Sequence, residues 1–96
     1  MDVLVAYDVS TETREGRRRL RRVAAACQAF GQRVQKSVFE CSVTATQLMQ
    51  LEQRLLGCID PKEDRLRIYR LMEPRELHVR IHGANTDVDF AAPLVV

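Results

Sequence analysis

Residues 33–43 read RVQKSVFECSV, and the phase of their hydrophobic alternation changes midway. Val34 is followed by three polar residues, after which Phe39, Cys41 and Val43 occupy alternate positions and therefore share one face. One flat strand does not fit this pattern, because a slip of one residue moves every following side chain to the other face of a sheet. We expect two short strands, or one strand with a bulge near residues 36–37.

The segment before this stretch predicts a strand followed by a helix. Residues 3–7 form a continuous hydrophobic run closed by Asp8, which is typical of a central strand buried on both faces. Residues 13–30 repeat hydrophobic side chains at helical spacing, and we expect Gly31 to end that helix. The hydrophobic stripe consists of Leu20, Val23, Ala24, Cys27 and Phe30.

The segment after the stretch predicts a helix and two strands. Thr44 and Gln47 have the spacing of a capping box, which would open a helix that Gly57 closes. Residues 65–71 and 77–82 alternate hydrophobic and polar side chains with the period of a strand. The complete order predicts an α+β, ferredoxin-like βαββαβ fold with an additional C-terminal strand.

The length of the chain allows a single hydrophobic core. We assign residues 1–72 of the 96 to the ferredoxin-like core and residues 73–96 to a C-terminal strand and tail. A chain of this size buries little surface alone, so a homodimer would add burial. No hydrophobic run reaches the roughly 18 residues of a membrane span, and no secretory leader is visible, so we expect a cytoplasmic protein without membrane contact.

The cysteines and histidines do not form a recognisable site. Cys27, Cys41 and Cys58 are odd in number and include no C-x-x-C pair, which argues against a disulfide framework and against a zinc site. We expect buried or incidental thiols in a reducing compartment. His78 and His82 would lie roughly 13 Å apart on the predicted strand, too far for one metal ion, so we expect surface histidines.

Positive charge is concentrated near the N-terminus. Residues 1–36 carry eight basic and four acidic side chains, whereas residues 37–96 carry seven basic and nine acidic ones. Arginine, whose planar fork suits phosphate, predominates in a run that has no acidic residue between positions 17 and 22. A solvated helix face is the ordinary explanation of such a run, but its self-repulsion favours contact with phosphates. The run consists of Arg14, Arg17, Arg18, Arg19, Arg21 and Arg22.

Asp8 is the first candidate for chemistry, because it follows a strand at the point where the chain turns towards a helix. A carboxylate there can hold a divalent cation, and it can equally cap a turn. No second carboxylate lies at a ligand-like spacing, so a metal site would need substrate phosphates, water or Asp8 of a second chain. Ser37 has no base nearby in the sequence, which argues against a serine nucleophile.

Three stretches of the chain resemble the CRISPR-associated endoribonuclease family, the small subunit of the CRISPR spacer-acquisition (adaptation) complex. They are AYDV at residues 6–9 with the arginine-rich helix that follows, GQRVQKSVFEC at residues 31–41, and DRLRIY at residues 64–69. The resemblance covers about residues 3–72, and its specific part is R-V-Q-x-S-V-F at residues 33–39.

The resemblance implies a homodimer in which the C-terminal strand, here residues 77–82, extends the sheet of the partner. It also implies that Asp8 of both chains meets at the dimer interface, binds Mg²⁺ and is catalytic. Tyr7, Ser37 and Phe39 match motif positions near that cleft. The expected nucleic-acid-binding residues are Arg14, Arg17, Arg18, Arg21, Arg22 and Arg33.

Two functions fit this resemblance. The first is metal-dependent hydrolysis of phosphodiester bonds in RNA or DNA by a CRISPR adaptation subunit. The second is a non-catalytic adaptor that bridges the larger integrase subunit and double-stranded DNA, with the arginine-rich helix contacting the DNA backbone and residues 84–96 contacting the partner protein. A ferredoxin-like regulatory or RNA-binding module outside CRISPR is a third interpretation, since fold alone does not set function.

Overall fold

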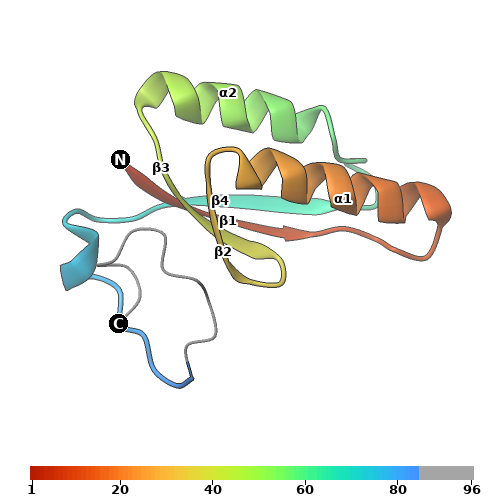
Figure 1. Cartoon of the computed structure of the whole chain (residues 1–96). Coiled ribbons are helices and arrows are strands. Elements are labelled where there is room, and N and C mark those ends of the chain that lie inside the picture. Colours follow the sequence, from red (N-terminus) through yellow and green to blue (C-terminus); the bar gives the residue numbers. More distant parts are fainter. Residues whose placement is uncertain (85–96) are drawn as a thin grey trace.

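The computed structural model describes residues 1–84 and shows a four-stranded antiparallel sheet with two helices on one face (Figure 1). The elements are β1 Asp2–Asp8, α1 Arg14–Gln28, β2 Gly31–Gln35, β3 Val38–Ser42, α2 Ala45–Leu56, β4 Arg65–Arg70 and the short 3-10 helix η1 Arg75–Leu77. The strand order in the sheet is β2-β3-β1-β4. The predicted ferredoxin-like βαββαβ fold is therefore confirmed.

The β2–β3 hairpin contains both features that the sequence left as alternatives. Two separate strands are joined by a turn at residues 36–37, and the register also slips between Arg33 and Gln35. Arg33 lies opposite Phe39 and Gln35 opposite Val38, so one residue of β2 has no counterpart on β3. The turn accounts for the change of phase. The bulge lies between Arg33 and Gln35, just before the turn.

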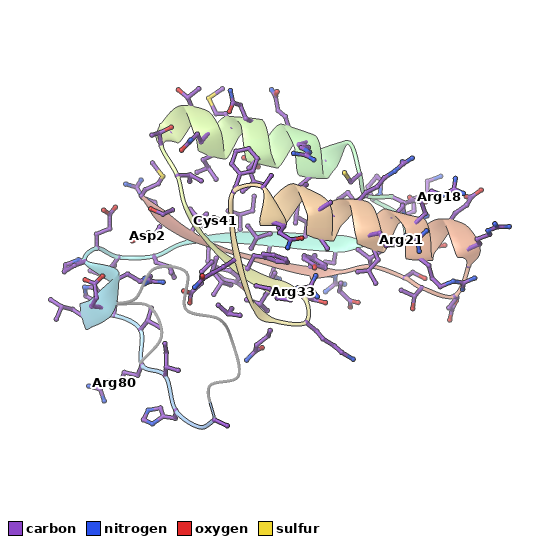
Figure 2. All side chains as sticks on the ribbon, in the orientation of Figure 1. Asp2, Arg18, Arg21, Arg33, Cys41 and Arg80 are labelled. Carbon is purple, nitrogen blue, oxygen red and sulfur yellow. The ribbon has the colours of Figure 1, made fainter. Side chains whose placement is uncertain are left out.

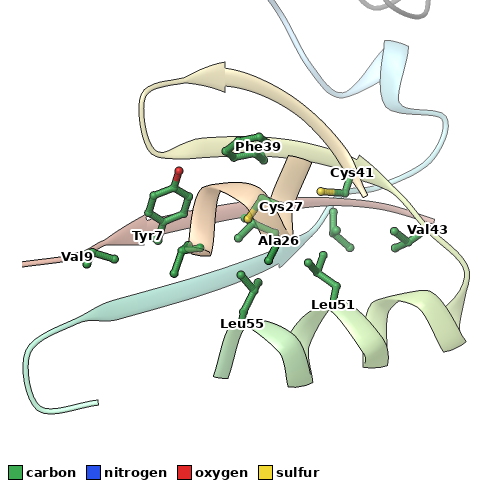
Figure 3. Packing of buried hydrophobic residues seen from close by; sticks show 12 residues of the cluster. Tyr7, Val9, Ala26, Cys27, Phe39, Cys41, Val43, Leu51 and Leu55 are labelled. Atoms are coloured by element: carbon green, nitrogen blue, oxygen red, sulfur yellow. The ribbon is translucent and has the colours of Figure 1, made fainter. Parts of the chain in front are cut away.

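The hydrophobic core lies between the two helices and one face of the sheet (Figure 3). The prediction that β1 is buried on both faces is wrong: its residues alternate between buried and half-buried. The helices cover only one side of the sheet, so Leu4 and Ala6 face the open side. The buried sheet residues are Val3, Val5, Tyr7, Phe39 and Cys41, and the buried helix residues are Val23, Ala26, Cys27, Leu51 and Leu55.

Capping residues set the ends of the helices, and both ends of α2 are capped as the sequence predicts. Thr13 caps α1, Thr44 and Gln47 form the capping box of α2, and Gly57 caps the end of α2. The exception is Gly31, because α1 ends at Ala29 and Gly31 is the first residue of β2. A Cβ on Gly31 would lie 2.2 Å from the carbonyl oxygen of residue 40, so the close approach of β3 explains this glycine.

The additional strand predicted at residues 77–82 is not formed in the single chain. Residues 75–77 form η1, and residues 78–84 contain no strand. A strand exists only when it pairs with a sheet edge, and within residues 1–84 this segment pairs with none. Leu77 and Ile81 therefore remain 75% and 54% exposed. Residues 85–96, which hold nearly all of the predicted tail, lie outside the described residues.

None of the helices within residues 1–84 is long and hydrophobic enough to cross a membrane.

Replacing Thr44 with Ala should lower the free energy of unfolding by about 1 kcal/mol. The Thr44 hydroxyl accepts a hydrogen bond from the Gln47 backbone amide (3.1 Å), and the Gln47 side chain accepts one from the Thr44 amide (2.9 Å). Urea unfolding measures the change. Thr46→Ala, at an exposed position of the same helix, is the matched control and should stay close to wild type. Equal stability of Thr44→Ala and wild type would contradict a role for this cap.

Candidate functional site

Asp8 is the last residue of β1, and its side chain is exposed on the face of the sheet that the helices leave open. Side chains alternate along a strand, and the neighbouring Tyr7 is buried on the helix side. Asp8 lies directly opposite Arg65 of β4, and Ala6 lies opposite Arg67. These five residues line a shallow hollow of about 140 Å³.

The loop that follows Asp8 is held in place by Asp64. The Asp64 carboxylate accepts hydrogen bonds from the backbone amides of Ser10 (3.1 Å) and Asp60 (2.8 Å). It also accepts two from the Arg19 guanidinium, at 2.8 Å from Nε and 3.3 Å from Nη2. Asp64 therefore connects the β1–α1 loop, helix α1 and the α2–β4 loop. Because β4 starts at Arg65, this connection fixes Asp8 relative to β4.

The Asp64–Arg19 pair is buried rather than solvated. The side chains are 0% and 17% exposed, respectively. Burial opposes the ionisation of Asp64, but the hydrogen bonds from Arg19, Asp60 and Ser10 outweigh it and hold the pKa of Asp64 below its usual range. Arg19 is consequently occupied within the fold, which separates it from the other arginines of its run.

A close backbone contact at Gly16 also positions the loop after Asp8. A Cβ on Gly16 would lie 1.9 Å from the carbonyl oxygen of Ser10, so only glycine fits at this point of α1. The sequence analysis missed Gly16 and Asp64 as supports of the site. The available signal was a glycine inside a predicted helix, which is unfavourable unless another part of the backbone approaches closely.

The remaining arginines of α1 form an exposed surface. We call this set the α1 arginine surface; it consists of Arg14, Arg17, Arg18, Arg21 and Arg22 (Figure 2). Arg17 donates a hydrogen bond to the Thr11 carbonyl (3.2 Å), and within residues 1–84 none of the five forms an ion pair. The surface lies on the solvent side of the helix layer, whereas Asp8 lies on the open face of the sheet. The protomer does not bring the two together.

The motif residues around Phe39 contact one another on the helix side of the sheet. The rings of Tyr7 and Phe39 are stacked with centroids 6.3 Å apart, and the Arg33 guanidinium lies 5.2 Å from the Phe39 centroid. Burial raises the pKa of Tyr7, and the nearby Arg33 opposes that rise. Ser37 lies in the hairpin turn, where its carbonyl accepts a hydrogen bond from the Tyr7 amide (3.1 Å). The side chains of Tyr7 and Phe39 therefore belong to the core (Figure 3).

The thiols and imidazoles lie where the sequence predicts. Burial raises the pKa of Cys27 to about 12 and that of Cys41 to about 11, so both thiols remain protonated. Cys58 is half-buried, and His78 and His82 are exposed.

A magnesium ion at Asp8 would need further ligands from water, phosphate or a second chain. Within residues 1–84, no group of three His, Cys, Asp or Glu side chains could hold a metal ion. Asp8 makes no ion pair among these residues, so its carboxylate is available. Mg²⁺ commonly takes one or two protein carboxylates and completes its shell with water and phosphate oxygens. An exposed Asp8 therefore fits as one of two symmetric ligands.

Replacing Asp64 with Asn should lower the melting temperature at neutral pH. All the groups that face Asp64 are donors, whereas an asparagine offers one acceptor oxygen and turns an NH₂ group towards them. Because the pKa of folded Asp64 is lowered, its stabilisation is present above the unfolded pKa and disappears as the pH falls through the folded pKa. The difference between variant and wild type should therefore shrink below about pH 4.

Thermal unfolding followed by circular dichroism between neutral and acidic pH measures this difference. Glu52→Gln, at an exposed position of α2, is the charge-matched control and should follow wild type at every pH. If the melting temperatures of Asp64→Asn and wild type differ by the same amount at all pH values, the stabilisation does not come from the ionised form of Asp64.

Comparison with known proteins places the chain among CRISPR proteins. Residues 1–78 match the family model of CRISPR associated protein Cas2. CRISPR-associated endoribonuclease Cas2 1 of Moorella thermoacetica is 59% identical over 96 residues, which is 100% of both chains. CRISPR-associated endonuclease Cas2 of Halalkalibacterium halodurans is 50% identical over 95 residues and 99% of both chains. The crystal structure of Streptococcus pyogenes Cas2 at pH 6.5 is 51% identical with a TM-score of 0.78, covering 86% of this chain and 100% of the other.

Proposed function

The chain belongs to the CRISPR associated protein Cas2 family, and we propose that it is a metal-dependent endonuclease whose catalytic centre is a pair of Asp8 side chains in a homodimer. The observation that carries this proposal is the position of Asp8 at the end of β1, exposed and without an ion-pair partner in the described chain. The names of relatives as endoribonuclease and endonuclease support a nuclease-type role in CRISPR adaptation.

The reaction is hydrolysis of a phosphodiester bond in nucleic acid. One P–O bond breaks, the hydroxyl of water adds to phosphorus, and the proton goes to the leaving oxygen. The two Asp8 carboxylates would hold Mg²⁺, which when bound polarises the phosphate and lowers the pKa of a water molecule. The contribution of the rest of the chain is positional, because Asp64 and Gly16 hold the loop behind Asp8 in one place.

The homodimer is supported by hydrophobic surface that the single chain leaves uncovered. Tyr69, Met72, Leu77 and Ile81, all in or after β4, are between 45% and 75% exposed. A second copy would bury these side chains, and residues 77–82 would gain a sheet edge to pair with. Pairing would also supply the second carboxylate that one chain lacks.

A non-catalytic adaptor is the second candidate, and the position of the α1 arginine surface favours it. The five arginines are exposed on helix α1, whereas Asp8 is exposed on the sheet face that the helices leave open, so duplex DNA could bind them without reaching Asp8. In that role the homodimer would bridge double-stranded DNA and the larger integrase subunit, which performs the chemistry. Single-stranded RNA remains a further substrate candidate for the nuclease.

Replacing Asp8 with Asn should abolish cleavage of end-labelled duplex DNA or single-stranded RNA in Mg²⁺, because a neutral amide is a poor magnesium ligand. The dimer should persist by size-exclusion chromatography, and nucleic-acid affinity should stay close to wild type. Glu12→Gln, an exposed carboxylate in the following loop, is the matched control and should cleave normally. Tight binding by wild type without any cleavage would instead support the adaptor.

Replacing Arg18 and Arg22 together with Ala should weaken nucleic-acid binding to a similar extent for unrelated sequences. Each lost phosphate contact should reduce the slope of log affinity against log salt by about 0.9 on duplex DNA. Fluorescence anisotropy at several salt concentrations measures both effects. Arg54→Ala with Lys62→Ala removes the same charge from exposed positions outside α1 and is the control. Strong sequence selectivity in the remaining binding would contradict backbone contact.

A further inference from the structure

We propose that Arg65 and Arg67 of β4 form, beside Asp8, a binding site for one phosphate of a nucleic-acid backbone. This inference rests on the proposed function, since it supplies the contact that would hold the phosphodiester at the Asp8 centre. It assigns a role to two arginines that lie outside the α1 arginine surface and outside the motif at residues 33–39.

The register of the sheet places both arginines next to Asp8. Arg65 lies directly opposite Asp8, and Arg67 lies opposite Ala6, two residues further along β4. Residues that face each other across a ladder point to the same side, so both arginines project onto the open face with Asp8. The three side chains surround the hollow of about 140 Å³. A cavity needs roughly 10–15 Å³ by this measure to hold one water, so a larger group fits.

Neither arginine is neutralised within residues 1–84. The two ion pairs there are Arg19–Asp64 and Arg75–Glu40. Arg67 donates one hydrogen bond, from Nη1 to the Tyr69 hydroxyl (2.9 Å), which orients its guanidinium and leaves its other donors free. Arg65 is exposed and makes no side-chain hydrogen bond to these residues. Two guanidinium groups beside one carboxylate leave one excess positive charge at the hollow.

The chemistry of these groups favours a phosphate as the ligand. A guanidinium presents paired donors that match two oxygens of a phosphate. Asp8 would repel such an anion by itself, but a cation bound at Asp8 reverses the sign of that interaction. A phosphodiester can then contact the cation and the arginines with different oxygens, which places the bond to be broken at the metal.

The position of β4 keeps the proposed phosphate site next to Asp8. Asp64, immediately before Arg65, is clamped to the loop immediately after Asp8. The clamp thereby holds the start of β4 and the end of β1 together, so the spacing between Arg65 and Asp8 is fixed by the fold. The α1 arginine surface lies on a helix that the clamp also holds, through Arg19, but not on the open face of the sheet that carries Asp8. The two sets of arginines should therefore act independently on affinity.

The test compares the double variant Arg65→Gln/Arg67→Gln with the control Arg70→Gln/Arg54→Gln in the full chain. Arg70 is on the same strand but faces the other side of the sheet, and Arg54 is on α2. The control therefore removes two positive charges, as the test variant does, but away from Asp8. Anisotropy with labelled duplex DNA and labelled single-stranded RNA, with Ca²⁺ in place of Mg²⁺ so that a cation can occupy Asp8, gives affinity and salt slope. Single-turnover cleavage in Mg²⁺ at saturating protein gives the rate of cleavage of bound substrate, so differences in affinity between the variants do not affect it.

We expect the double variant to lose roughly tenfold or more in single-turnover rate and to lower the salt slope by about 0.9 per phosphate contact removed. Arg65→Lys/Arg67→Lys should restore the slope but only part of the rate, because lysine keeps the charge without the paired donors. Wild-type slope and rate in an intact Gln double variant would overturn the inference alone. Loss of the dimer in that variant would assign the arginines to the interface and also overturn it.

Failure of the proposed function has a different result. If wild type binds nucleic acid but cleaves nothing, the nuclease proposal is wrong. If the double variant still lowers the salt slope in that case, the phosphate site is supported. Wild type that binds no nucleic acid overturns both.

Discussion

The Asp64 carboxylate accepts four hydrogen bonds from three separate segments, and the relative positions of β1, α1 and β4 depend on it. It is a fully buried anion whose charge is balanced by Arg19 and by two backbone amides. An interaction of this kind is stable only when every acceptor position is matched by a donor. Here the donors come from helix α1 and from the two loops next to the ends of β1 and β4.

The two faces of the sheet carry different kinds of residues because the helices cover only one of them. The covered face holds Tyr7 and Phe39 in the core, with Arg33 on the Phe39 ring at the edge. The open face carries Asp8, Arg65 and Arg67 together with half-buried Leu4 and Ala6. The motif at residues 33–39 therefore serves packing to a large extent, while the residues suited to phosphate chemistry lie on the other side.

Much of the fold follows from local patterns in the sequence, whereas the surroundings of Asp8 do not. The capping box at Thr44, the helical stripe of α1 and the change of phase after Val34 each reflect neighbours within a few residues. The clamp at Asp64 joins residues 45 and 54 positions apart in the chain, and no periodicity marks such a contact. Arg65 and Arg67 were visible as the polar side of a strand, but only the sheet order places that strand beside β1. The strand predicted at residues 77–82 is absent for a related reason, since this segment pairs with no strand within residues 1–84.

The involvement of Arg19 in the clamp affects how the rest of its helix meets a ligand. A helix held by hydrophobic contact alone can rotate slightly about its axis, but an ion pair to a fully buried carboxylate fixes that rotation. The five outward arginines therefore form an array whose direction is set before anything binds, and Arg17 is further held by its hydrogen bond to the Thr11 carbonyl. A stiff array of charges loses less entropy on binding a regular polymer than a freely turning one. It also tolerates distortion of that polymer less well, so the helix should favour partners whose charge spacing is already uniform.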